Sequence, residues 1–435
     1  MSVSRIERVR RSKGTRPSVS AATVPAVLVG LDSMQGLQAA RILHARGVPV
    51  IAFAKDPKNA ACRTNVCREI RITKTRSEEL ISDLENLGRT LGEKAVLFPC
   101  EDQNVRLISR FRNVLEPWFH IALPPPDTVE MLMDKTRFYR YAIGEGLPIP
   151  PTYFLETRDD LGYALQSLEF PAILKPSNSA TRLWEKNCMF SAFKVEGERE
   201  LFTLYERYRH FADVMILQEW IAGPDSNLFS CNTYFGTDGE PLVTFVARKV
   251  RQWPPHIGKS SLGVECRSEA VEQETLRLFR GVGYRGLGYV EFKLDERNGR
   301  QYIVEPNVGR PTGRSAIAEA GGVELLYTMY CDLTGLPLPE NRKQKYVGAK
   351  WIHLRRDLQS ALYYWRRGDL TISQWLQSWR GHKAYALFSL RDPRPFLSDT
   401  WRVVRTMMSS EERRRRDWTI EAESVTVPDQ PETAT

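Results

Sequence analysis

The stretch between residues 287 and 307 constrains the fold of this chain more than any other, because it has the pattern of a β-hairpin. Two runs rich in β-branched and aromatic residues, 287–294 and 301–307, flank an Asn298-Gly299 pair. Asn-Gly between two such runs is a strong local signal for a tight turn. We therefore expect an antiparallel pair of strands here.

The predicted hairpin brings acidic side chains together. Side chains alternate between the two faces of a strand, so Glu305 and Asn307 share a face, and Glu291 lies nearly opposite Glu305. A strict two-residue turn would pair Glu291 with Pro306, so a bulge or a longer loop is needed to align the two acids. Neighbouring carboxylates repel unless a cation lies between them, and oxygen-only ligands suit Mg²⁺. The pattern predicts a magnesium site, with a solvated acidic hairpin as the alternative.

Length and composition favour a globular protein with more than one core. The chain has 435 residues, enough for two or three packed domains, and its apolar and charged contents are ordinary. No apolar run reaches the roughly 18 residues of a membrane span. Its seven cysteines are scattered and its six histidines do not cluster. Reduced thiols in a cytoplasmic compartment are expected, and a transition-metal site is not.

The net charge of +9 lies at the ends of the chain. Residues 1–25 and 341–418 are strongly basic, residues 419–435 are acidic, and residues 26–340 are slightly acidic. This distribution argues against a core that reads nucleic acid, although basic ends can meet anionic surfaces. We predict disordered tails over 1–25 and 419–435. An organelle transit peptide is the less favoured interpretation of the first.

Residues 26–125 have the pattern of an open parallel α/β domain. A short apolar strand, a glycine turn, a helix and a buried strand follow each other over 26–53, which is a βαβ unit. A helix over 77–91, a strand over 95–99 and a helix over 102–115 continue the alternation. In such folds small molecules bind at the carboxyl ends of the strands, so we expect a binding rim there.

Residues 126–340 mix helices with antiparallel strands, which predicts an α+β domain after the first. The predicted elements are a helix over 131–144, strands over 170–175 and 214–221, a second hairpin over 228–250, and helices over 268–281 and 315–334.

The segment 341–418 predicts a basic, tryptophan-rich helical extension, which holds six of the ten tryptophans between residue 350 and its end. Apolar residues recur at helical spacing in two places: Leu358, Ala361, Leu362 and Trp365, then Ile372, Trp375, Leu376 and Trp379. Packing of these stripes onto the rest of the protein is the favoured interpretation. The alternative is peripheral contact with a membrane through residues 355–380.

Basic residues upstream and downstream of the acidic hairpin point to phosphate chemistry. Lys135 and Lys175 lie where an α/β scaffold aims an ammonium at a phosphate, and the small polar residues 177–180 follow the second. Arg248, Lys249 and Arg251 in one basic run, together with Arg310, add cations near the expected metal. Mg²⁺ together with arginine and lysine side chains is typical of sites that catalyse phosphoryl transfer. A P-loop motif is absent from the sequence.

The segment Gln218-Glu219-Trp220-Ile221-Ala-Gly-Pro-Asp225 suits contacts with a purine edge and a ribose. An ordinary strand end is an equal alternative.

The order of these motifs resembles the ATP-grasp superfamily, closest to its carboxylate–amine ligase branch, which includes D-aspartate ligase-like enzymes. The motifs are Asp134-Lys135, Leu174-Lys175-Pro, Gln218-Glu219-x-Ile-x-Gly-x-Asp225, Glu291-Phe-Lys and Glu305-x-Asn307. The resemblance covers about residues 26–340. It implies a pre-ATP-grasp α/β domain (26–125) and a two-lobed ATP-grasp domain (126–340) that clamps ATP. It also implies a reaction through an acylphosphate, which an amine converts to an amide.

The resemblance assigns roles by position. Lys135 and Lys175 would hold the ATP phosphates, Glu219, Trp220, Ile221 and Asp225 the adenine and ribose, and Glu291, Glu305 and Asn307 one or two Mg²⁺ ions, with Mn²⁺ as a substitute. Arg310 would steady the acylphosphate, and Arg251 would bind a substrate carboxylate. Two features depart from the pattern: the loop after Lys175 is not glycine-rich, and Val308-Gly309 precedes Arg310.

The function expected from the sequence is therefore an ATP- and Mg²⁺-dependent ligase that joins a small carboxylic acid to a small amine. One alternative is a non-catalytic ATP-binding or scaffolding protein on an anionic surface. Another keeps the acylphosphate but uses a thiol as the nucleophile. We expect a cytoplasmic protein, with contact at the inner membrane face as an option. The sequence predicts no nucleic-acid partner, and it leaves the oligomeric state open.

Overall fold

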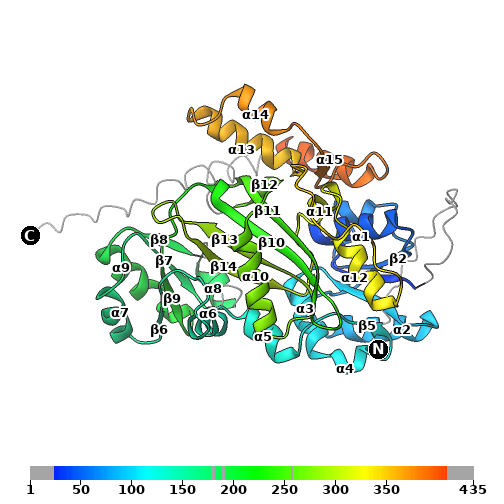
Figure 1. Ribbon diagram of the computed structural model, residues 1–435, viewed down its shortest axis with the longest axis horizontal. Helices are drawn as coiled ribbons and strands as arrows, with labels where there is room; N and C mark the ends of the chain where they lie inside the picture. The colour runs from blue at the N-terminus through cyan, green and yellow to red at the C-terminus, as the bar shows by residue number, and fades with distance from the viewer. Residues whose placement is uncertain (1–23, 178–181, 189–191, 256–257, 409–435) are drawn as a thin grey trace, which may run out of the picture.

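The computed structural model describes residues 24–177, 182–188, 192–255 and 258–408. Within these residues the strands form three sheets, and Figure 1 shows helices packed around them. The mixture of parallel α/β and antiparallel α+β layers with a C-terminal helical extension is the predicted fold class. Most of the two predicted disordered tails and most of the loop after Lys175 lie outside the described residues.

The first sheet is entirely parallel, in the order β3-β2-β1-β4-β5. Its elements are β1 (Ala26–Val29), α1 (Met34–Ala45), β2 (Val50–Ala54), η1 (Ala60–Arg63), β3 (Glu69–Ile72), α2 (Glu79–Leu91), β4 (Ala95–Pro99), α3 (Asp102–Arg110), α4 (Arg112–Leu115) and β5 (Phe119–His120). The predicted helix over 102–115 is interrupted at Phe111, and β3 and β5 were not predicted. Because the strands run parallel, their carboxyl ends meet at one edge.

The second sheet has seven strands in the order β14-β13-β10-β11-β12-β15-β16 and carries the predicted acidic hairpin. Its strands are β10 (Leu228–Phe235), β11 (Pro241–Trp253), β12 (Lys259–Glu265), β13 (Gly286–Leu294), β14 (Gln301–Val308), β15 (Lys350–Ile352) and β16 (Lys383–Tyr385). The C-terminal extension thus adds two edge strands, which the sequence did not reveal.

The register of β13 and β14 aligns the two acids by a bulge, as the sequence required. Glu291 pairs with Glu305, and the register then shifts so that Phe292 pairs with Ile303 and Val304 has no partner in the ladder. The turn contains Gly299 at a φ of 69°, a left-handed conformation that glycine adopts without strain.

The third sheet has four antiparallel strands in the order β6-β9-β7-β8. It consists of β6 (Thr152–Leu155), β7 (Ala172–Pro176), β8 (Phe193–Val195) and β9 (Met215–Glu219), with helices α7 (Arg158–Leu165), α8 (Arg182–Asn187), α9 (Glu198–Tyr208) and η2 (Arg209–Phe211). Short turn η3 (Asp225–Asn227) leads from this sheet to β10.

Two helices predicted as continuous are each divided in the structure. In place of one helix over 131–144 there are α5 (Pro126–Met133) and α6 (Lys135–Gly144), because Asp134 caps α6 by accepting a hydrogen bond from the Arg137 N–H. In place of one helix over 315–334 there are α11 (Ala316–Ala320) and α12 (Leu325–Thr334), separated by Gly321-Gly322. Helix α10 (Glu269–Gly281), capped by Ser268, agrees with prediction.

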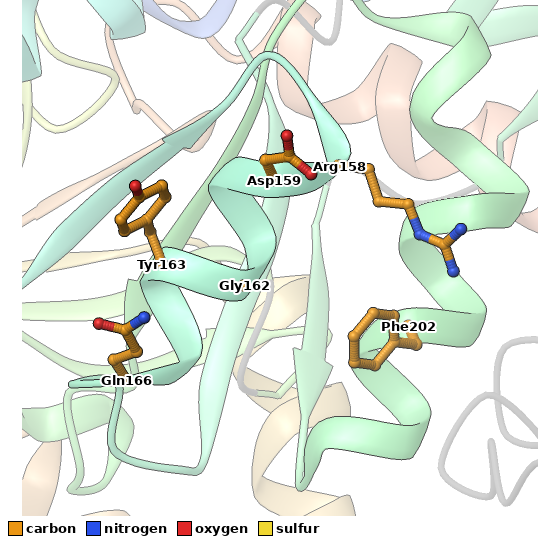
Figure 2. Close-up of a pocket in the computed structure, with 6 residues that line it drawn as sticks. All are labelled: Arg158, Asp159, Gly162, Tyr163, Gln166 and Phe202. Atoms are coloured by element: carbon orange, nitrogen blue, oxygen red, sulfur yellow. The ribbon is translucent and has the colours of Figure 1, made fainter.

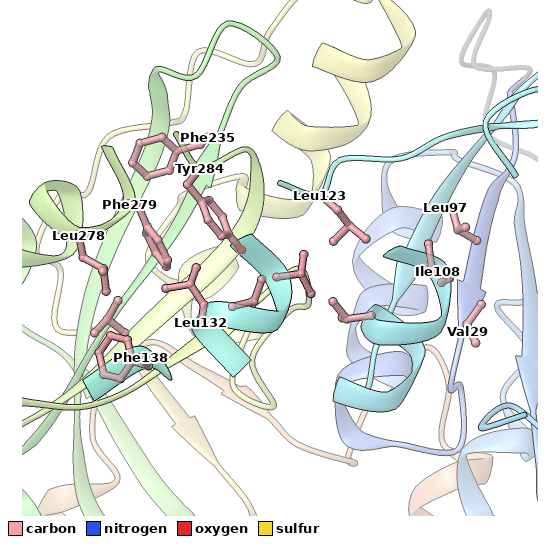
Figure 3. Close-up of a cluster of buried hydrophobic side chains, with 14 of the residues drawn as sticks. Val29, Leu97, Ile108, Leu123, Leu132, Phe138, Phe235, Leu278, Phe279 and Tyr284 are labelled. Carbon is pink, nitrogen blue, oxygen red and sulfur yellow. The ribbon is translucent and has the colours of Figure 1, made fainter. Parts of the chain in front are cut away.

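One apolar core joins the first sheet to the second. Figure 3 shows it running from the parallel sheet through α5 to α10 and β10. Its buried members include Val29, Leu97, Ile108, Leu132, Phe138, Phe235, Phe279 and Tyr284. Because this core is continuous, the carboxyl edge of the parallel sheet is held at a fixed position relative to the acidic hairpin.

The C-terminal helices are fastened to the second sheet by one buried carboxylate. Helices α13 (Leu354–Arg366), α14 (Ile372–Ser378) and α15 (Arg394–Met408) lie together at one end of the molecule (Figure 1). Asp357 of α13 is fully buried and accepts two hydrogen bonds from Arg251 of β11, at 2.9 and 3.0 Å. It also accepts from the indole N–H groups of Trp375 and Trp379, at 2.9 and 2.7 Å.

We expect Asp357→Ala to lower the free energy of unfolding by about 3–5 kcal/mol, because it leaves the buried Arg251 charge without its partner. Urea denaturation followed by circular dichroism measures the change. Asp369→Ala, which removes an exposed carboxylate in the same region, should change it by less than about 1 kcal/mol. Equal effects of the two substitutions would contradict the role of Asp357.

Candidate functional site

The two hairpin acids lie between cations supplied by neighbouring elements. The Glu291 carboxylate is 3.8 Å from Lys249 Nζ of β11 and 3.8 Å from Arg314 Nη2. Burial alone would raise the pKa of Glu291, but Lys249, Arg314 and Arg310 bring it below its ordinary value. Glu291 is therefore an anion at neutral pH.

The second acid has the opposite shift. Burial and the charge of Glu291 raise the pKa of Glu305, and Lys135, Lys175 and Arg310 oppose that rise. Solvent still reaches the Glu305 side chain, which limits the effect of burial. The pKa values of Glu291 and Glu305 thus shift in opposite directions, as is typical of two close carboxylates with no metal cation between them.

Asn307 and Arg310 connect the hairpin to the first sheet. Arg310 is buried and donates to Asn307 Oδ1 at 2.7 Å, to the Tyr289 hydroxyl at 2.8 Å and to both carboxylate oxygens of Asp102. Burial lowers the pKa of Arg310, but Tyr289 and Asp102 outweigh that effect and raise it. The guanidinium is a permanent cation held between the hairpin and α3.

The two predicted phosphate lysines lie in the same region as Glu305. Lys175 is buried at the end of β7 and donates to the Tyr139 hydroxyl at 2.9 Å, and Tyr139 donates in turn to the Val304 carbonyl at 2.7 Å. Burial lowers the pKa of Lys175 to about 8, against the opposing effect of Glu305. Burial and the charge of Lys175 lower the pKa of Lys135, the first residue of α6.

The predicted nucleotide segment follows β9 and approaches the hairpin at Lys293. Glu219 accepts from the Glu169 N–H at 3.2 Å, and Ile221 is half-buried. The Lys293 ammonium is 4.7 Å from the centre of the Trp220 ring. Burial lowers the pKa of Lys293, and the Asp225 charge opposes this shift.

Asp225 is already hydrogen-bonded within the protein. It is buried and accepts from Gln252 Nε2 at 2.9 Å and from the Tyr364 hydroxyl at 3.0 Å. The adenine and ribose roles of this segment stay predictions.

Arg251 does not face the acids. Its guanidinium is held by Asp357 and by Ser378 Oγ at 2.8 Å, so it is engaged with the C-terminal helices. Lys249, two residues earlier, is the basic residue of β11 that faces Glu291. The substrate role expected for Arg251 stays a prediction, and the contacts of its side chain do not favour it.

The donor set at the hairpin fits a hard cation together with phosphate. Among the described residues, no group of three or more His, Cys, Asp and Glu side chains is placed to hold a metal ion. The hairpin offers two carboxylates and an amide, which leaves positions for water and phosphate oxygens on Mg²⁺. Asn307 Nδ2 is buried without a hydrogen-bond partner in the described part of the chain, and a phosphate oxygen would satisfy this donor.

A shallow depression between α7 and α9 is separate from this site. Figure 2 shows its lining side chains, among them Arg158, Tyr163 and Phe202. None of the predicted site residues lines it.

Known proteins similar in sequence are ligases. D-aspartate ligase from Enterococcus faecium (strain Aus0004) is 26% identical over 242 residues, which are 52% of this chain and 55% of that protein. D-alanine–D-alanine ligase B from Chromobacterium violaceum is 27% identical over 184 residues, 40% of this chain and 56% of that protein. The matched part thus spans little more than half the length of these relatives. No family model matches the chain.

Solved structures share the fold over most of the chain. N5-carboxyaminoimidazole synthetase from Staphylococcus aureus with ADP has a TM-score of 0.58 at 14% identity and covers 74% of this chain and 80% of that one. Biotin carboxylase from Campylobacter jejuni has a TM-score of 0.57 at 16% identity and covers 73% and 72%. The chain shares the ATP-grasp fold of these structures, and its sequence is similar to that of ligases. The predicted resemblance is supported, and the predicted fold class is confirmed.

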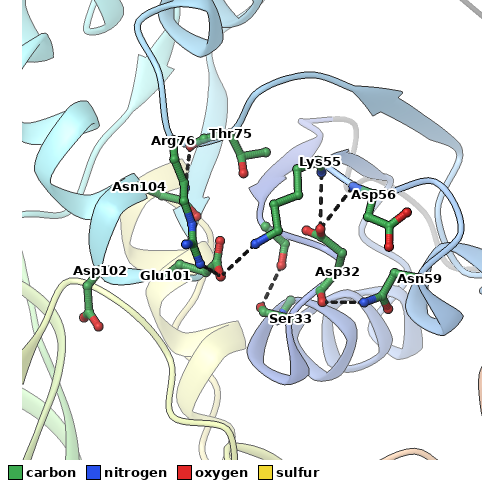
Figure 4. Close-up of polar contacts among 12 residues, drawn as sticks. Asp32, Ser33, Lys55, Asp56, Asn59, Thr75, Arg76, Glu101, Asp102 and Asn104 are labelled. Atoms are coloured by element: carbon green, nitrogen blue, oxygen red, sulfur yellow. Dashed lines mark hydrogen bonds and ion pairs between the residues drawn. The ribbon is translucent and has the colours of Figure 1, made fainter. Parts of the chain in front are cut away.

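The chain has a second polar cluster at the carboxyl edge of its parallel sheet (Figure 4). We call it the sheet-edge cluster, and it comprises Asp32, Lys55, Thr75, Arg76, Glu101 and Asn104. The sequence predicted a binding rim at this edge without indicating which residues form it. The available signal was a charged residue soon after each of three buried strands: Asp32 after β1, Lys55 after β2 and Glu101 after β4.

Cations and acids of the sheet-edge cluster are partly paired. Arg76 donates to Glu101 Oε1 at 2.9 Å, and Lys55 Nζ is 3.9 Å from the same oxygen. The backbone N–H groups of Lys55 and Asp56 donate to Asp32 Oδ2 at 3.3 and 3.2 Å. One oxygen of each acid is thereby occupied.

The remaining oxygens of this cluster lack partners. Asp32 Oδ1, Glu101 Oε2 and Asn104 Oδ1 are buried and accept no hydrogen bond in the described residues. A Cβ atom added at Gly30 would lie 2.9 Å from Asn104 Oδ1 and 3.3 Å from Glu101 Cγ, so these two side chains converge on Gly30, directly after β1. Buried acceptors without partners are costly, and a ligand with several N–H donors would satisfy them.

The sheet-edge cluster adjoins the acidic hairpin through one residue. Asp102 follows Glu101 directly and holds Arg310, which holds Asn307. Lys249 belongs to the basic run 248–251 that the sequence predicted near the metal. Asp102 and Arg314 were not predicted, because the partner of each lies far away along the chain.

The lowered pKa of Lys175 predicts that ATP affinity depends on pH. A group with a pKa of about 8 is mostly charged at pH 7.5 and mostly neutral at pH 9, so the dissociation constant for ATP should rise roughly five- to tenfold over this range. Isothermal titration calorimetry at both pH values measures it.

Lys175→Met should bind ATP more weakly at pH 7.5 and change little by pH 9, whereas the exposed-site control Lys94→Met should behave like the wild type. A pH dependence that persists in Lys175→Met would contradict this assignment.

Proposed function

We propose that this chain is an ATP- and Mg²⁺-dependent ligase that joins a small carboxylic acid to a small amine through an acylphosphate. The observation that carries the proposal is the paired Glu291 and Glu305, with Asn307 beside them and two lysines facing Glu305. This arrangement suits a metal nucleotide and the transfer of its terminal phosphate. The ligases related in sequence support the same reaction class.

In the first step, an oxygen of the substrate carboxylate attacks the γ-phosphorus of ATP. The bond between that phosphorus and the β,γ-bridging oxygen breaks, and its electron pair leaves with ADP. Lys135 and Lys175 hold the phosphate chain by their charge, and Glu291, Glu305 and Asn307 would hold Mg²⁺. The metal, when bound, neutralises the oxygens of the transferred phosphate.

In the second step, the amine attacks the acyl carbon, the C–N bond forms, and inorganic phosphate leaves with the electron pair of the acyl C–O bond. Arg310 is held where it can stabilise the departing phosphate charge. We assign the amine to the sheet-edge cluster, where Asp32, Glu101 and Asn104 offer unpaired acceptors. Asp32 accepts the proton that the amine loses.

We also propose which metal ion can replace Mg²⁺ and where in the cell the protein lies. Mn²⁺ should replace Mg²⁺, because both accept oxygen ligands in octahedral geometry. A cytoplasmic location agrees with the seven free cysteines, and we propose that the protein can lie against the inner membrane face. If the nucleophile were a thiol, the acylphosphate would still form in the first step. If the protein only bound ATP without catalysis, neither step would take place.

Glu305→Gln should lower turnover by at least about 100-fold, because it removes a negative charge that would bind the metal. The fold should stay intact, because the side chain is exposed to solvent. ADP release over a panel of D- and L-amino acids, followed by mass spectrometry of the product, measures turnover in the wild type and the variant. Glu296→Gln, in the exposed hairpin loop, is the matched control.

Normal turnover in Glu305→Gln would contradict the site. ATP binding by the wild type without ADP release on any acid and amine pair would favour the non-catalytic role. A thioester product would replace the amine with a thiol.

Asp32→Asn should raise the KM for the amine about tenfold or more and leave ATP affinity unchanged, because it removes one charge from the sheet-edge cluster. Asp56→Asn, a neighbouring exposed site, should leave both values unchanged. A KM increase for the carboxylic acid instead of the amine would reassign the cluster to the other substrate.

A further inference from the structure

Helices α13 and α14 turn their apolar stripes away from the protein. Leu358, Leu362 and Trp365 of α13 and Ile372 and Leu376 of α14 have between 42% and 59% of their surface exposed. The favoured expectation, that these stripes pack on the body, is wrong for these five residues. It holds for Ala361, which is buried, and for Trp375 and Trp379, which are half-buried and donate to Asp357.

The side of α13 that faces the protein explains this orientation, because its polar residues form hydrogen bonds and an ion pair with the body of the protein. Asp357 binds Arg251, and Tyr364 donates to Asp225 at 3.0 Å. Ser360 is buried on the same side. Turning the helix to bury Leu362 and Trp365 would break these contacts and leave a buried arginine unpaired, so the apolar side stays outside.

Helix α15 repeats the pattern next to them. Leu397, Trp401 and Val404 are spaced one helical turn apart on its exposed side, and Trp401 is 71% exposed. Arg355 at the start of α13 lies 3.6 Å from Asp399 of α15, which places the two helices in contact. All three helices lie at the same end of the molecule (Figure 1).

The charge around these stripes is positive. Between residues 354 and 406 there are ten basic residues and four acidic ones. Asp357, Asp392 and Asp399 are buried against basic or hydroxyl partners, so Asp369 is the one exposed acid in this interval. Arg366 and Arg380 are exposed at the same end, and so is Arg402, which pairs with Asp399 at 3.0 Å.

We propose that this apolar–arginine face, formed by the exposed stripes of α13, α14 and α15 and the arginines around them, rests on an anionic lipid surface. Tryptophan and leucine side chains enter the headgroup region while arginines pair with anionic headgroups, which is how amphipathic helices lie in an interface. None of the described helices is long and apolar enough to cross a membrane. A second copy of the chain fits less well, because two such faces would bring their arginines together.

The inference does not depend on the ligase reaction, since it uses none of the residues assigned to catalysis. Its role would be to hold the ligase at the membrane surface.

Co-sedimentation of the full chain with vesicles tests the proposal. Wild type should pellet with phosphatidylcholine vesicles that contain about one third phosphatidylglycerol and not with phosphatidylcholine alone, and added salt should weaken binding. Failure to pellet with the anionic vesicles at low salt would overturn it.

A double variant separates the face from the basic tails. Leu362→Glu with Trp365→Glu should weaken vesicle binding at least tenfold, whereas Tyr163→Glu, at a 72% exposed position on α7, should not. Arg366→Gln alone should weaken binding about fivefold. Far-ultraviolet circular dichroism and ATP affinity should match the wild type in all three.

Two outcomes would contradict the role proposed for the apolar–arginine face. Unchanged vesicle binding by the double variant would place the attraction in the terminal basic residues, such as the arginines at 413–416, and would overturn the proposal. A wild-type dimer in size-exclusion chromatography that the double variant converts to a monomer, without vesicle binding by either, would make the face an interface between two copies.

Discussion

The repulsion between Glu291 and Glu305 is the constraint on which the rest of the site depends. A bulge after Glu291 sets the two carboxylates directly opposite each other, where neither can stay charged without nearby cations. Lys249 and Arg314 come from one side, and the lysines that face Glu305 from the other. A metal nucleotide would complete this balance by placing positive charge between the acids and negative charge before the lysines.

The same network joins two sheets into one site. Arg310 binds Asn307 on the hairpin and Asp102 at the start of α3, which follows β4 of the first sheet. A single buried cation thus connects the proposed metal ligands with the unpaired acceptors of the sheet-edge cluster. The continuous apolar core beneath them fixes that geometry (Figure 3). A two-step ligation needs such proximity, because the acylphosphate must meet the amine before water reaches it.

The C-terminal helices illustrate how a buried charge can orient an amphipathic element. Helix α13 has an apolar stripe that would normally face a core, yet its polar side faces inward because Asp357 is needed opposite Arg251. The apolar stripe of α13 is therefore exposed on the surface of the protein. Periodicity alone detects both sides of such a helix and does not say which is buried.

By itself the sequence determined the local elements and the chemical class: the Asn298-Gly299 hairpin, the need for a bulge, the parallel first domain and the ATP-grasp motifs. These rest on neighbouring residues, whose conformational preferences act over a few positions. Only the tertiary structure decided which charges pair. Arg310 meets Asp102 across 208 positions and Arg251 meets Asp357 across 106. Such contacts depend on how the sheets pack, and no local pattern carries that information.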